Sequence, residues 1–316
     1  MYHPLITMKF RGMDLVSIRD LTVPQMNRIM DVAEGMVPIA KGEKVSKLLD
    51  GKILATLFYE PSTRTKLSFE SAMMRLGGRV IGFSDPKSSS VAKGETLADT
   101  IRMADAYSDL IVLRYRNEGA ARLAADFSEV PVINAGDGAG QHPTQTLLDL
   151  FTMREEMGKI EGKHIALLGD LKYGRTVHSL SEALAMFGAK LSFVSPKGLE
   201  MPAETVENVQ KLGSEPFITN CVEDVIGDVD ILYVTRIQKE RFADLAEYKK
   251  VAGSFQVNME LLEKAKKSMR VMHPLPRVTE IDPEVDSTPH ALYFKQAFNG
   301  VPVRMALMAL IMGAVE

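Results

Sequence analysis

The sequence predicts an α/β fold with two domains, each built as three layers around a parallel sheet. Three observations lead to this prediction. Short apolar runs alternate with segments of helical periodicity, a pattern typical of βαβ units on a parallel sheet. The alternation occurs twice, on either side of a longer helical segment at 143–157. The 316 residues are enough for two domains of ordinary size.

The first series of elements begins with a helix expected at 23–40, with Thr22 as its cap and Pro24 in its first turn. A polar, turn-prone stretch at 85–93 predicts a surface loop. The remaining elements are inferred from apolar runs and helical spacing. They are strands at 52–59, 79–84, 109–114 and 130–134, and helices at 64–76, 95–106 and 118–127.

The second series begins after Gly162. Its strands are expected at 163–168, 190–194, 216–219, 230–235 and 269–272, and its helices at 175–187, 202–212 and 258–267. Residues 236–253 form a long charged loop or an irregular helix, and a last helix covers 290–315. We therefore expect a first domain over 1–142, to which a C-terminal helix at 290–316 returns, a second domain over 143–289, and an active-site cleft between the two.

Composition limits the functional classes. Hydrophobic residues make up 46% of the chain and charged residues 25%, as in a globular protein. The formal net charge of −3 provides no general attraction for nucleic acid or for an anionic membrane. Cys221 is the only cysteine, so an intrachain disulfide is excluded and a reducing cytoplasm fits. No secretory signal or membrane span is expected, and Met8 is an alternative start.

The most informative local feature is the run Glu60-Pro-Ser-Thr-Arg-Thr65, which lies where a buried strand ends and a helix begins. Backbone N–H groups at a helix start lack partners, and the helix dipole favours negative charge there. Hydroxyl groups from Ser62, Thr63 and Thr65 and the planar fork of Arg64 add donors that suit a phosphate. The alternative interpretation is that Ser62 or Thr63 merely caps the helix.

Other polar groups also lie just after predicted strands. Ligands of open α/β sheets bind at the carboxyl ends of the strands, and six of the strands end in Arg, His, Gln or hydroxyl groups. These groups include Arg114, His142, Gln145, Arg175, Arg236, Gln238, His273 and Arg277. Although one arginine at a strand end is usually a surface residue, this recurrence predicts a positively charged cleft for a ligand with several anionic groups.

Several other chemistries lack their motifs. The chain contains no G-x-G-x-x-G, no P-loop, no G-x-S-x-G and no H-E-x-x-H, and no carboxylate cluster suggests a metal. We therefore expect neither a metal nor a cofactor. On its own, His142 is as consistent with a helix cap as with a ligand-binding role. His273 precedes Pro-Leu-Pro and is interpreted as structural.

Three motifs together resemble a known family. Ser-Thr-Arg-Thr at 62–65, His-Pro-Thr-Gln at 142–145 and His-Pro-Leu-Pro at 273–276 are similar, in order and spacing, to the signature of the aspartate and ornithine carbamoyltransferases. The segments 93–96, 169–179 and 235–241 resemble the aspartate branch of that family. The resemblance covers nearly the whole chain. It implies a transferase that carbamoylates L-aspartate with carbamoyl phosphate in de novo pyrimidine biosynthesis.

The resemblance also implies roles for individual residues. The phosphate would be held by Ser62, Thr63, Arg64, Thr65 and Arg114, and the carbonyl oxygen would be reached by Thr65, Arg114 and His142. The carbamoyl NH2 would be held by Gln145 and by the backbone carbonyls of Pro274 and Leu275, which precede Pro276. The aspartate carboxylates would be held by Arg175, Arg236 and Gln238. Of these residues, Arg64, Thr65, Arg114 and His142 would be catalytic.

The family pattern further implies that Ser89 and Lys93 enter the active site of a neighbouring subunit, so that a homotrimer with shared sites would be the smallest active unit. Residues 90–92 lack the glycine and the extra lysine often seen in this loop, which leaves its mobility open. The sequence does not say whether a regulatory chain binds such trimers.

Two alternatives are open. The acceptor could be ornithine, but ornithine enzymes usually have His-Cys-Leu-Pro where this chain has His-Pro-Leu-Pro, and Arg236 would repel a cationic acceptor. The chain could also be a scaffold that kept the fold and lost activity, but this predicts gaps among the site residues, and none is present.

Overall fold

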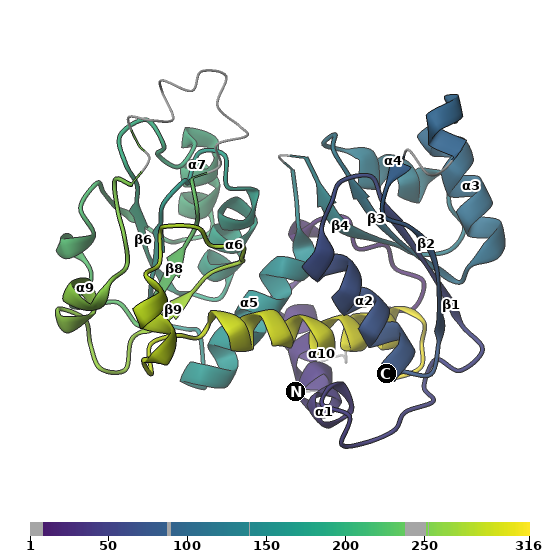
Figure 1. The fold of residues 1–316 in the computed structure, drawn as a ribbon, viewed down its shortest axis with the longest axis horizontal. Coiled ribbons are helices and arrows are strands. Elements are labelled where there is room, and N and C mark those ends of the chain that lie inside the picture. The colour runs from purple at the N-terminus through teal and green to yellow at the C-terminus, as the bar shows by residue number, and fades with distance from the viewer. Residues whose placement is uncertain (1–8, 87–89, 139, 238–250, 252) are drawn as a thin grey trace, which may run out of the picture. The chain divides into compact units, whose positions relative to one another are not determined.

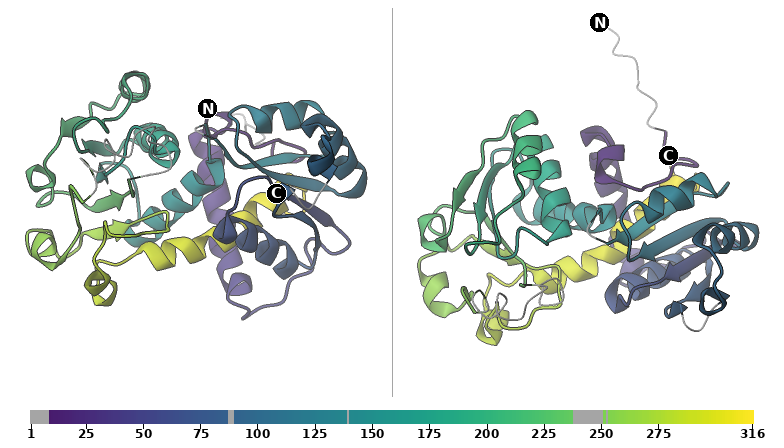
Figure 2. Two further views of the ribbon diagram at one scale, coloured as in Figure 1. Left: turned by 45° about the horizontal axis from the view of Figure 1, so that its top comes forward. Right: turned by 90° about the horizontal axis from the view of Figure 1, so that it is seen from above.

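The structure is a computed structural model that describes residues 9–86, 90–138, 140–237, 251 and 253–316 (Figure 1). The chain divides into two compact units. Unit 1 comprises Met1–Leu147 and Gly300–Glu316, and unit 2 comprises Leu148–Asn299. Both contain a parallel sheet flanked by helices, as two further views show (Figure 2), which confirms the predicted α/β class. The predicted domain boundaries, after residues 142 and 289, stay predictions.

The sheet of unit 1 has four parallel strands in the order β2-β1-β3-β4. The strands are β1 (Ile53–Phe58), β2 (Arg79–Phe83), β3 (Leu110–Tyr115) and β4 (Val132–Asp137). Five of the six residues of β1 are buried, as expected for a strand covered on both faces. Beside β4, Leu15 forms a parallel bridge to Ile133, so the N-terminal segment covers the edge of that strand.

The helices of unit 1 begin close to the predicted positions. They are α1 (Val23–Ala40), α2 (Thr63–Arg75), α3 (Leu97–Tyr107), α4 (Ala120–Asp126) and the start of α5 (Pro143–Met157). Thr22 caps α1 through a reciprocal capping box with Gln25, which confirms the predicted cap. Helix α2 turns Phe69, Ala72 and Met73 into the core. A short 3₁₀ helix, Ser90–Lys93, precedes α3.

The C-terminal helix α10 (Tyr293–Ile311) joins unit 1 from Gly300 onward. Met305 to Ile311 are all at most 1% exposed. The carbonyl of Ile311 accepts a hydrogen bond from the amide of Gly12, with an N···O distance of 2.9 Å. The expected return of the last helix to the first domain is therefore confirmed.

Unit 2 has five parallel strands in the order β7-β6-β5-β8-β9. They are β5 (His164–Leu168), β6 (Lys190–Val194), β7 (Phe217–Thr219), β8 (Ile231–Val234) and β9 (Arg270–Met272), with helices α6 (Arg175–Met186), α7 (Ala203–Lys211) and α9 (Met259–Glu263). The topology reverses direction between β5 and β8, which is the switch point where α/β sheets bind ligands.

Several elements are shorter than predicted, among them α10, expected at 290–315, and α9. The helix expected at 258–267 ends at Glu263, and Leu261 and Leu262 are its buried residues. Most of the charged segment predicted at 236–253 lies outside the described residues. Within the described part of the chain, no helix combines the length and apolarity needed to cross a membrane.

Candidate functional site

The start of α2 carries the predicted phosphate ligands. Ser62 occupies the N-cap position, but its side chain makes no capping hydrogen bond. The interpretation of Ser62 as a mere cap therefore loses its support. Thr63 and Arg64 are exposed, whereas Thr65 is 8% exposed. Although Arg64 is exposed, partial desolvation lowers the pKa of its guanidinium, and arginine nevertheless stays charged in proteins.

Arg114 joins the ends of three strands. It lies in register with Phe58 of β1, and its carbonyl accepts a hydrogen bond from the amide of Tyr59. Its Nη1 donates to the carbonyl of Ala135 on β4 at 2.9 Å. Its Nη2 lies 3.7 Å from a carboxylate oxygen of Glu60, and its side chain is 13% exposed. The guanidinium is thus held at the carboxyl edge of the sheet, next to the turn that begins α2.

His142 and Gln145 lie where α5 begins. His142 is 5% exposed, and its carbonyl accepts a hydrogen bond from the amide of Gln145 at 2.9 Å. Asp137 organises the preceding loop: one carboxylate oxygen accepts from the Gln141 amide at 2.8 Å, and the other accepts from the Gly119 amide at 3.0 Å. The sequence contains no sign of this role of Asp137, because these hydrogen-bond partners are not apparent from spacing.

Lys93 is the last residue of the 3₁₀ helix and is exposed. Next to it, Val91 and Leu97 pack against an apolar cluster that contains Tyr59. The Tyr59 ring centroid lies 4.6 Å from that of Tyr115. Val91 and Leu97, on either side of Lys93, therefore pack against the cluster that contains Tyr59, the residue just before Glu60. Ser89, the second residue predicted in this loop, lies outside the described residues.

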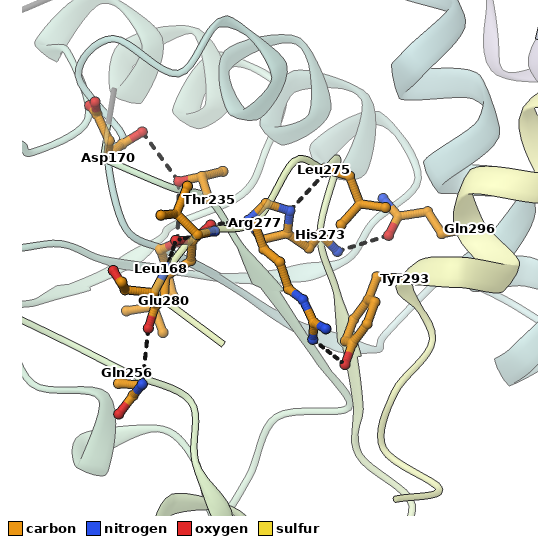
Figure 3. Close-up of polar contacts among 12 residues, drawn as sticks. Leu168, Asp170, Thr235, Gln256, His273, Leu275, Arg277, Glu280, Tyr293 and Gln296 are labelled. Atoms are coloured by element: carbon orange, nitrogen blue, oxygen red, sulfur yellow. Dashed lines mark hydrogen bonds and ion pairs between the residues drawn. The ribbon is translucent and has the colours of Figure 1, made fainter. Parts of the chain in front are cut away.

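In unit 2, Arg175 begins α6 after the loop 169–174. The loop is folded by Asp170, whose carboxylate accepts from the amide of Tyr173 at 2.9 Å and whose carbonyl accepts from the Thr235 hydroxyl at 3.4 Å (Figure 3). Gly169 has φ +122°, and a Cβ there would lie 2.2 Å from the Thr235 carbonyl oxygen. Only glycine allows this close approach between the ends of β5 and β8.

Arg236 is half-buried and comes directly after Thr235 at the end of β8. The amide of Thr235 donates to the carbonyl of Leu168 at 2.8 Å, so Arg236 lies beside the loop that leads to Arg175. Gln238 lies outside the described residues. The segment Pro274-Leu275-Pro276 comes after β9, which pairs with β8, and contains a cis peptide bond between Leu275 and Pro276.

The predicted residues thus fall into two groups, each at the carboxyl ends of one parallel sheet. Unit 1 contains Ser62, Thr63, Arg64, Thr65, Lys93, Arg114, His142 and Gln145, and unit 2 contains Arg175, Arg236, Pro274, Leu275 and Pro276. Hydroxyl, guanidinium and amide donors dominate the group in unit 1, and Arg175 and Arg236 add guanidinium groups in unit 2. Such donors bind anions with several oxygens. The described residues include no cluster of three or more His, Cys, Asp or Glu side chains placed to hold a metal ion.

Fold and site together define an α/β protein whose two parallel sheets each present donors for anionic ligands. Residues 13–155 match the family described as aspartate/ornithine carbamoyltransferase, carbamoyl-P binding domain. Residues 161–311 match its Asp/Orn binding domain. The chain belongs to the aspartate/ornithine carbamoyltransferase family.

Several curated relatives and solved structures resemble the chain over almost its whole length. The aspartate carbamoyltransferase catalytic subunit of Methanococcoides burtonii is 57% identical over 98% of this chain and 100% of its own. That of Thermococcus gammatolerans is 58% identical over 97% and 99%. The catalytic subunit of M. jannaschii aspartate transcarbamoylase has a TM-score of 0.89 and 54% identity, covering 95% and 98%. The Trypanosoma cruzi aspartate transcarbamoylase in complex with carbamoyl phosphate and aspartate has a TM-score of 0.91 and 40% identity, covering 96% and 98%.

Proposed function

We propose that the chain transfers the carbamoyl group of carbamoyl phosphate to the amine of L-aspartate, which gives N-carbamoyl-L-aspartate and phosphate. The observation that carries the proposal is the turn at Ser62–Thr65, whose N-cap hydroxyl does not cap its own helix and whose neighbour Arg114 is held in place by Glu60 and Ala135. Relatives that match this chain over almost its whole length are named aspartate carbamoyltransferase catalytic subunit. The reaction would serve de novo pyrimidine biosynthesis.

In this proposal the phosphate binds at the start of α2. Ser62, Thr63 and Thr65 donate through hydroxyl groups, Arg64 donates through its fork, and the amides of the first helical turn add their partial positive charge. The ion pair between Arg114 and Glu60 is partly exposed. A phosphate dianion would therefore compete with the carboxylate of Glu60 for the Arg114 guanidinium.

The carbamoyl group lies between donors and acceptors. Thr65, Arg114 and His142 act on the carbonyl oxygen, and each well-placed donor of this kind typically contributes about 2.7–4 kcal/mol to transition-state stabilisation. The side-chain oxygen of Gln145 and the backbone carbonyls of Pro274 and Leu275 accept hydrogen bonds from the NH2 group. An acyl group has no such NH2, so these acceptors select a carbamoyl group.

Aspartate binds through its two carboxylates. Arg175 and Arg236 provide the cationic partners, and Gln238 assists Arg236. The amine nitrogen attacks the carbonyl carbon, the bond from that carbon to the phosphate oxygen breaks, and the departing phosphate takes up the proton that the amine loses. The step needs no protein nucleophile, since holding two anions in attacking geometry against their mutual repulsion supplies most of the rate enhancement.

The proposal includes a homotrimer in which Ser89 and Lys93 act in the site of the neighbouring chain. Lys93 is exposed, and lysine is a flexible point charge suited to a loop that closes on an anion. Leu67 and Met74, seven positions apart on α2, are 59% and 60% exposed, and Ile81 on β2 is 41% exposed. Leu67 and Met74 share one face of α2, and another chain in a trimer could cover this face.

The name "catalytic subunit" among the relatives supports a regulatory partner chain as well. The chain has a single cysteine and so cannot form an intrachain disulfide. This supports a cytoplasmic location, because disulfides are rare in the reducing cytoplasm.

The experiment that tests the function compares acceptors. The purified chain is incubated with carbamoyl phosphate and either L-aspartate or L-ornithine, and phosphate release and carbamoylated product are both measured. We expect phosphate and N-carbamoyl-L-aspartate in equal amounts with aspartate, and only background hydrolysis with ornithine. Faster turnover with ornithine would select the other branch of the family, and no turnover with either would support the scaffold alternative.

A further inference from the structure

The inference begins at Leu275, which has an unusual backbone conformation. Its φ is +55°, and it is the one non-glycine residue with positive φ among the residues that the structure describes. A branched side chain rarely adopts this region, because the conformation is strained and persists only where the surroundings hold it in place. Such conformations cluster where a ligand is clamped. The surroundings that hold Leu275 are therefore of functional interest.

The imidazole of His273 holds the amide of Leu275. The Leu275 N–H donates to Nδ1 of His273 at 2.8 Å. Because Nδ1 accepts this bond, it carries no proton. The proton of the neutral ring must then reside on Nε2, which lies 2.8 Å from a carboxylate oxygen of Glu280 and donates to it. The tautomer of His273 is thus fixed by the hydrogen-bond geometry.

Glu280 is held in turn by the backbone of the same loop. Its second carboxylate oxygen accepts from the amides of Val278 and Thr279, both at 3.1 Å. Burial raises the pKa of Glu280, but the hydrogen bonds from His273 and the backbone more than offset this and lower it. The carboxylate is therefore ionised and orients the Nε2–H bond of His273.

The backbone of His273 is anchored separately. Its amide donates to the side-chain oxygen of Gln296 on α10 at 2.8 Å (Figure 3). The Gln296 amide group donates to Asp149 on α5 at 2.7 Å, and Asp149 also accepts from the hydroxyl of Tyr233 at 2.8 Å. All of these residues are at most 1% exposed. The start of the loop therefore has little freedom to shift, and the ring of His273 determines the direction of residues 274–276.

We propose that His273 is a positioning residue whose Nε2–H tautomer fixes the Leu275 amide and thereby aims the carbonyls of Pro274 and Leu275 at the NH2 group of carbamoyl phosphate. This inference rests on the proposed function. Protonation of Nδ1 would place an N–H against the Leu275 N–H and break the arrangement. Glu280, Arg277 and Arg236 are the charged groups that act on the ring, and burial together with the two arginines lowers the pKa of His273 despite Glu280.

Two substitutions separate the two ring nitrogens. In His273→Asn the side-chain oxygen falls near the position of Nδ1 and can still accept from Leu275, but the contact to Glu280 is lost. In His273→Gln the side-chain amide reaches the position of Nε2 and can still donate to Glu280, but Leu275 loses its acceptor. Comparing the two variants therefore tests the hydrogen bond from the Leu275 amide to Nδ1, while the polarity of the side chain stays similar.

The readout compares ligands with and without the NH2 group. Affinities for carbamoyl phosphate, acetyl phosphate and inorganic phosphate are measured by titration on the full chain. We expect His273→Gln to weaken the binding of carbamoyl phosphate about tenfold, which is the effect of losing one hydrogen bond. The affinities for acetyl phosphate and inorganic phosphate should change less than about twofold. His273→Asn should stay close to wild type for all three. Equal losses for all three ligands, or equal behaviour of Asn and Gln, would overturn the inference.

A measurement on the unmodified protein keeps the inference testable if either variant fails to fold. Nitrogen-15 NMR of the histidine rings should show Nε2 protonated and Nδ1 unprotonated for the buried His273 at neutral pH, and the opposite tautomer or a charged ring would exclude it. If wild-type chain binds carbamoyl phosphate but does not carbamoylate aspartate, the proposed function fails while the ligand comparison still decides the role of His273.

Discussion

Arg304 on the C-terminal helix donates a hydrogen bond from Nη1 to the hydroxyl of Ser68 at 2.7 Å, although the two residues are 236 positions apart in the sequence. The hydroxyl of Ser68 in turn donates a hydrogen bond to the carbonyl of Thr65 at 2.8 Å, so Ser68 connects Arg304 to Thr65. The guanidinium also lies 4.8 Å from the ring centroid of Phe69, and Arg304 is 3% exposed. The last helix thereby stabilises the turn that carries the predicted phosphate ligands and brings a positive charge close to it.

The first prediction tests this relay. Ser68→Ala should lower the free energy of unfolding by about 1–3 kcal/mol, because a hydrogen bond to a charged donor is lost and Arg304 stays buried. It should also weaken binding of inorganic phosphate, since Thr65 loses a contact. Urea denaturation and phosphate titration check both effects. Ser71→Ala deletes the same atom further along α2 and serves as the control; if it has equal effects, the relay is unimportant.

The second prediction concerns Arg64. Arg64→Ala should reduce kcat/KM by a factor of about 100 or more, because charge-assisted hydrogen bonds to phosphate contribute roughly 1.5–3 kcal/mol or more. The fold should survive, since Arg64 is exposed. Steady-state kinetics and circular dichroism measure the two outcomes. Arg102→Ala, an exposed arginine on α3 paired with Asp99, should leave turnover unchanged. Near-normal turnover of the Arg64 variant would refute its assignment.

The third prediction separates the two substrates. Arg236→Ala should raise KM for aspartate far more than KM for carbamoyl phosphate, because its guanidinium is proposed to bind the side-chain carboxylate of aspartate. Each KM is measured with the other substrate saturating. Arg270→Ala is the control from the neighbouring strand β9, where Arg270 pairs with Glu156 instead. Equal increases of both KM values would show that Arg236 is not a specific aspartate contact.

The fourth prediction tests shared active sites. The inactive variants Lys93→Ala and Arg64→Ala are dissociated, mixed and reassociated. If Lys93 acts in the neighbouring chain, some sites of a mixed trimer combine both defects and others have neither, so partial activity should return. Native mass spectrometry confirms that hybrids form. A mixture of proven hybrids that stays as inactive as its parents would place Lys93 in its own chain's site.

The fifth prediction concerns pH. Burial lowers the pKa values of His164, His178 and His273, all in unit 2, below the ordinary 6.5. At a pH between the lowered pKa values and 6.5, the unfolded chain binds more protons than the folded chain. The contribution of these neutral histidines to the free energy of unfolding is therefore complete above pH 6.5 and is lost as the pH falls through the lowered pKa values. His273 alone should contribute a slope of up to about 1.4 kcal/mol per pH unit.

Urea denaturation at pH 7.5, 6.5 and 5.5 measures this dependence. His273→Asn should reduce the slope, because the titrating group is removed. A free energy of unfolding that stays constant from pH 7.5 to 5.5 would contradict the prediction, since over that range most carboxylates remain ionised in both states.

The sequence by itself determined where most elements lie. Strand β6 and helix α5 have the predicted bounds of 190–194 and 143–157. Leu191, Phe193 and Val194 mark the short strand, and a helix repeats its apolar positions every three to four residues. The positions of the predicted site residues at strand ends came from the same patterns. Their individual roles in binding stay predictions.

Only the tertiary structure decided which distant residues touch. The strand order of each sheet, the early end of α9, the contact of Arg304 with Ser68 and the tautomer of His273 all depend on how elements pack against one another. Periodicity reports the face that a residue occupies but not the partner that it meets. His273 was interpreted as structural for this reason, because Glu280 and Gln296, which orient it, are brought to it by the fold and not by local spacing.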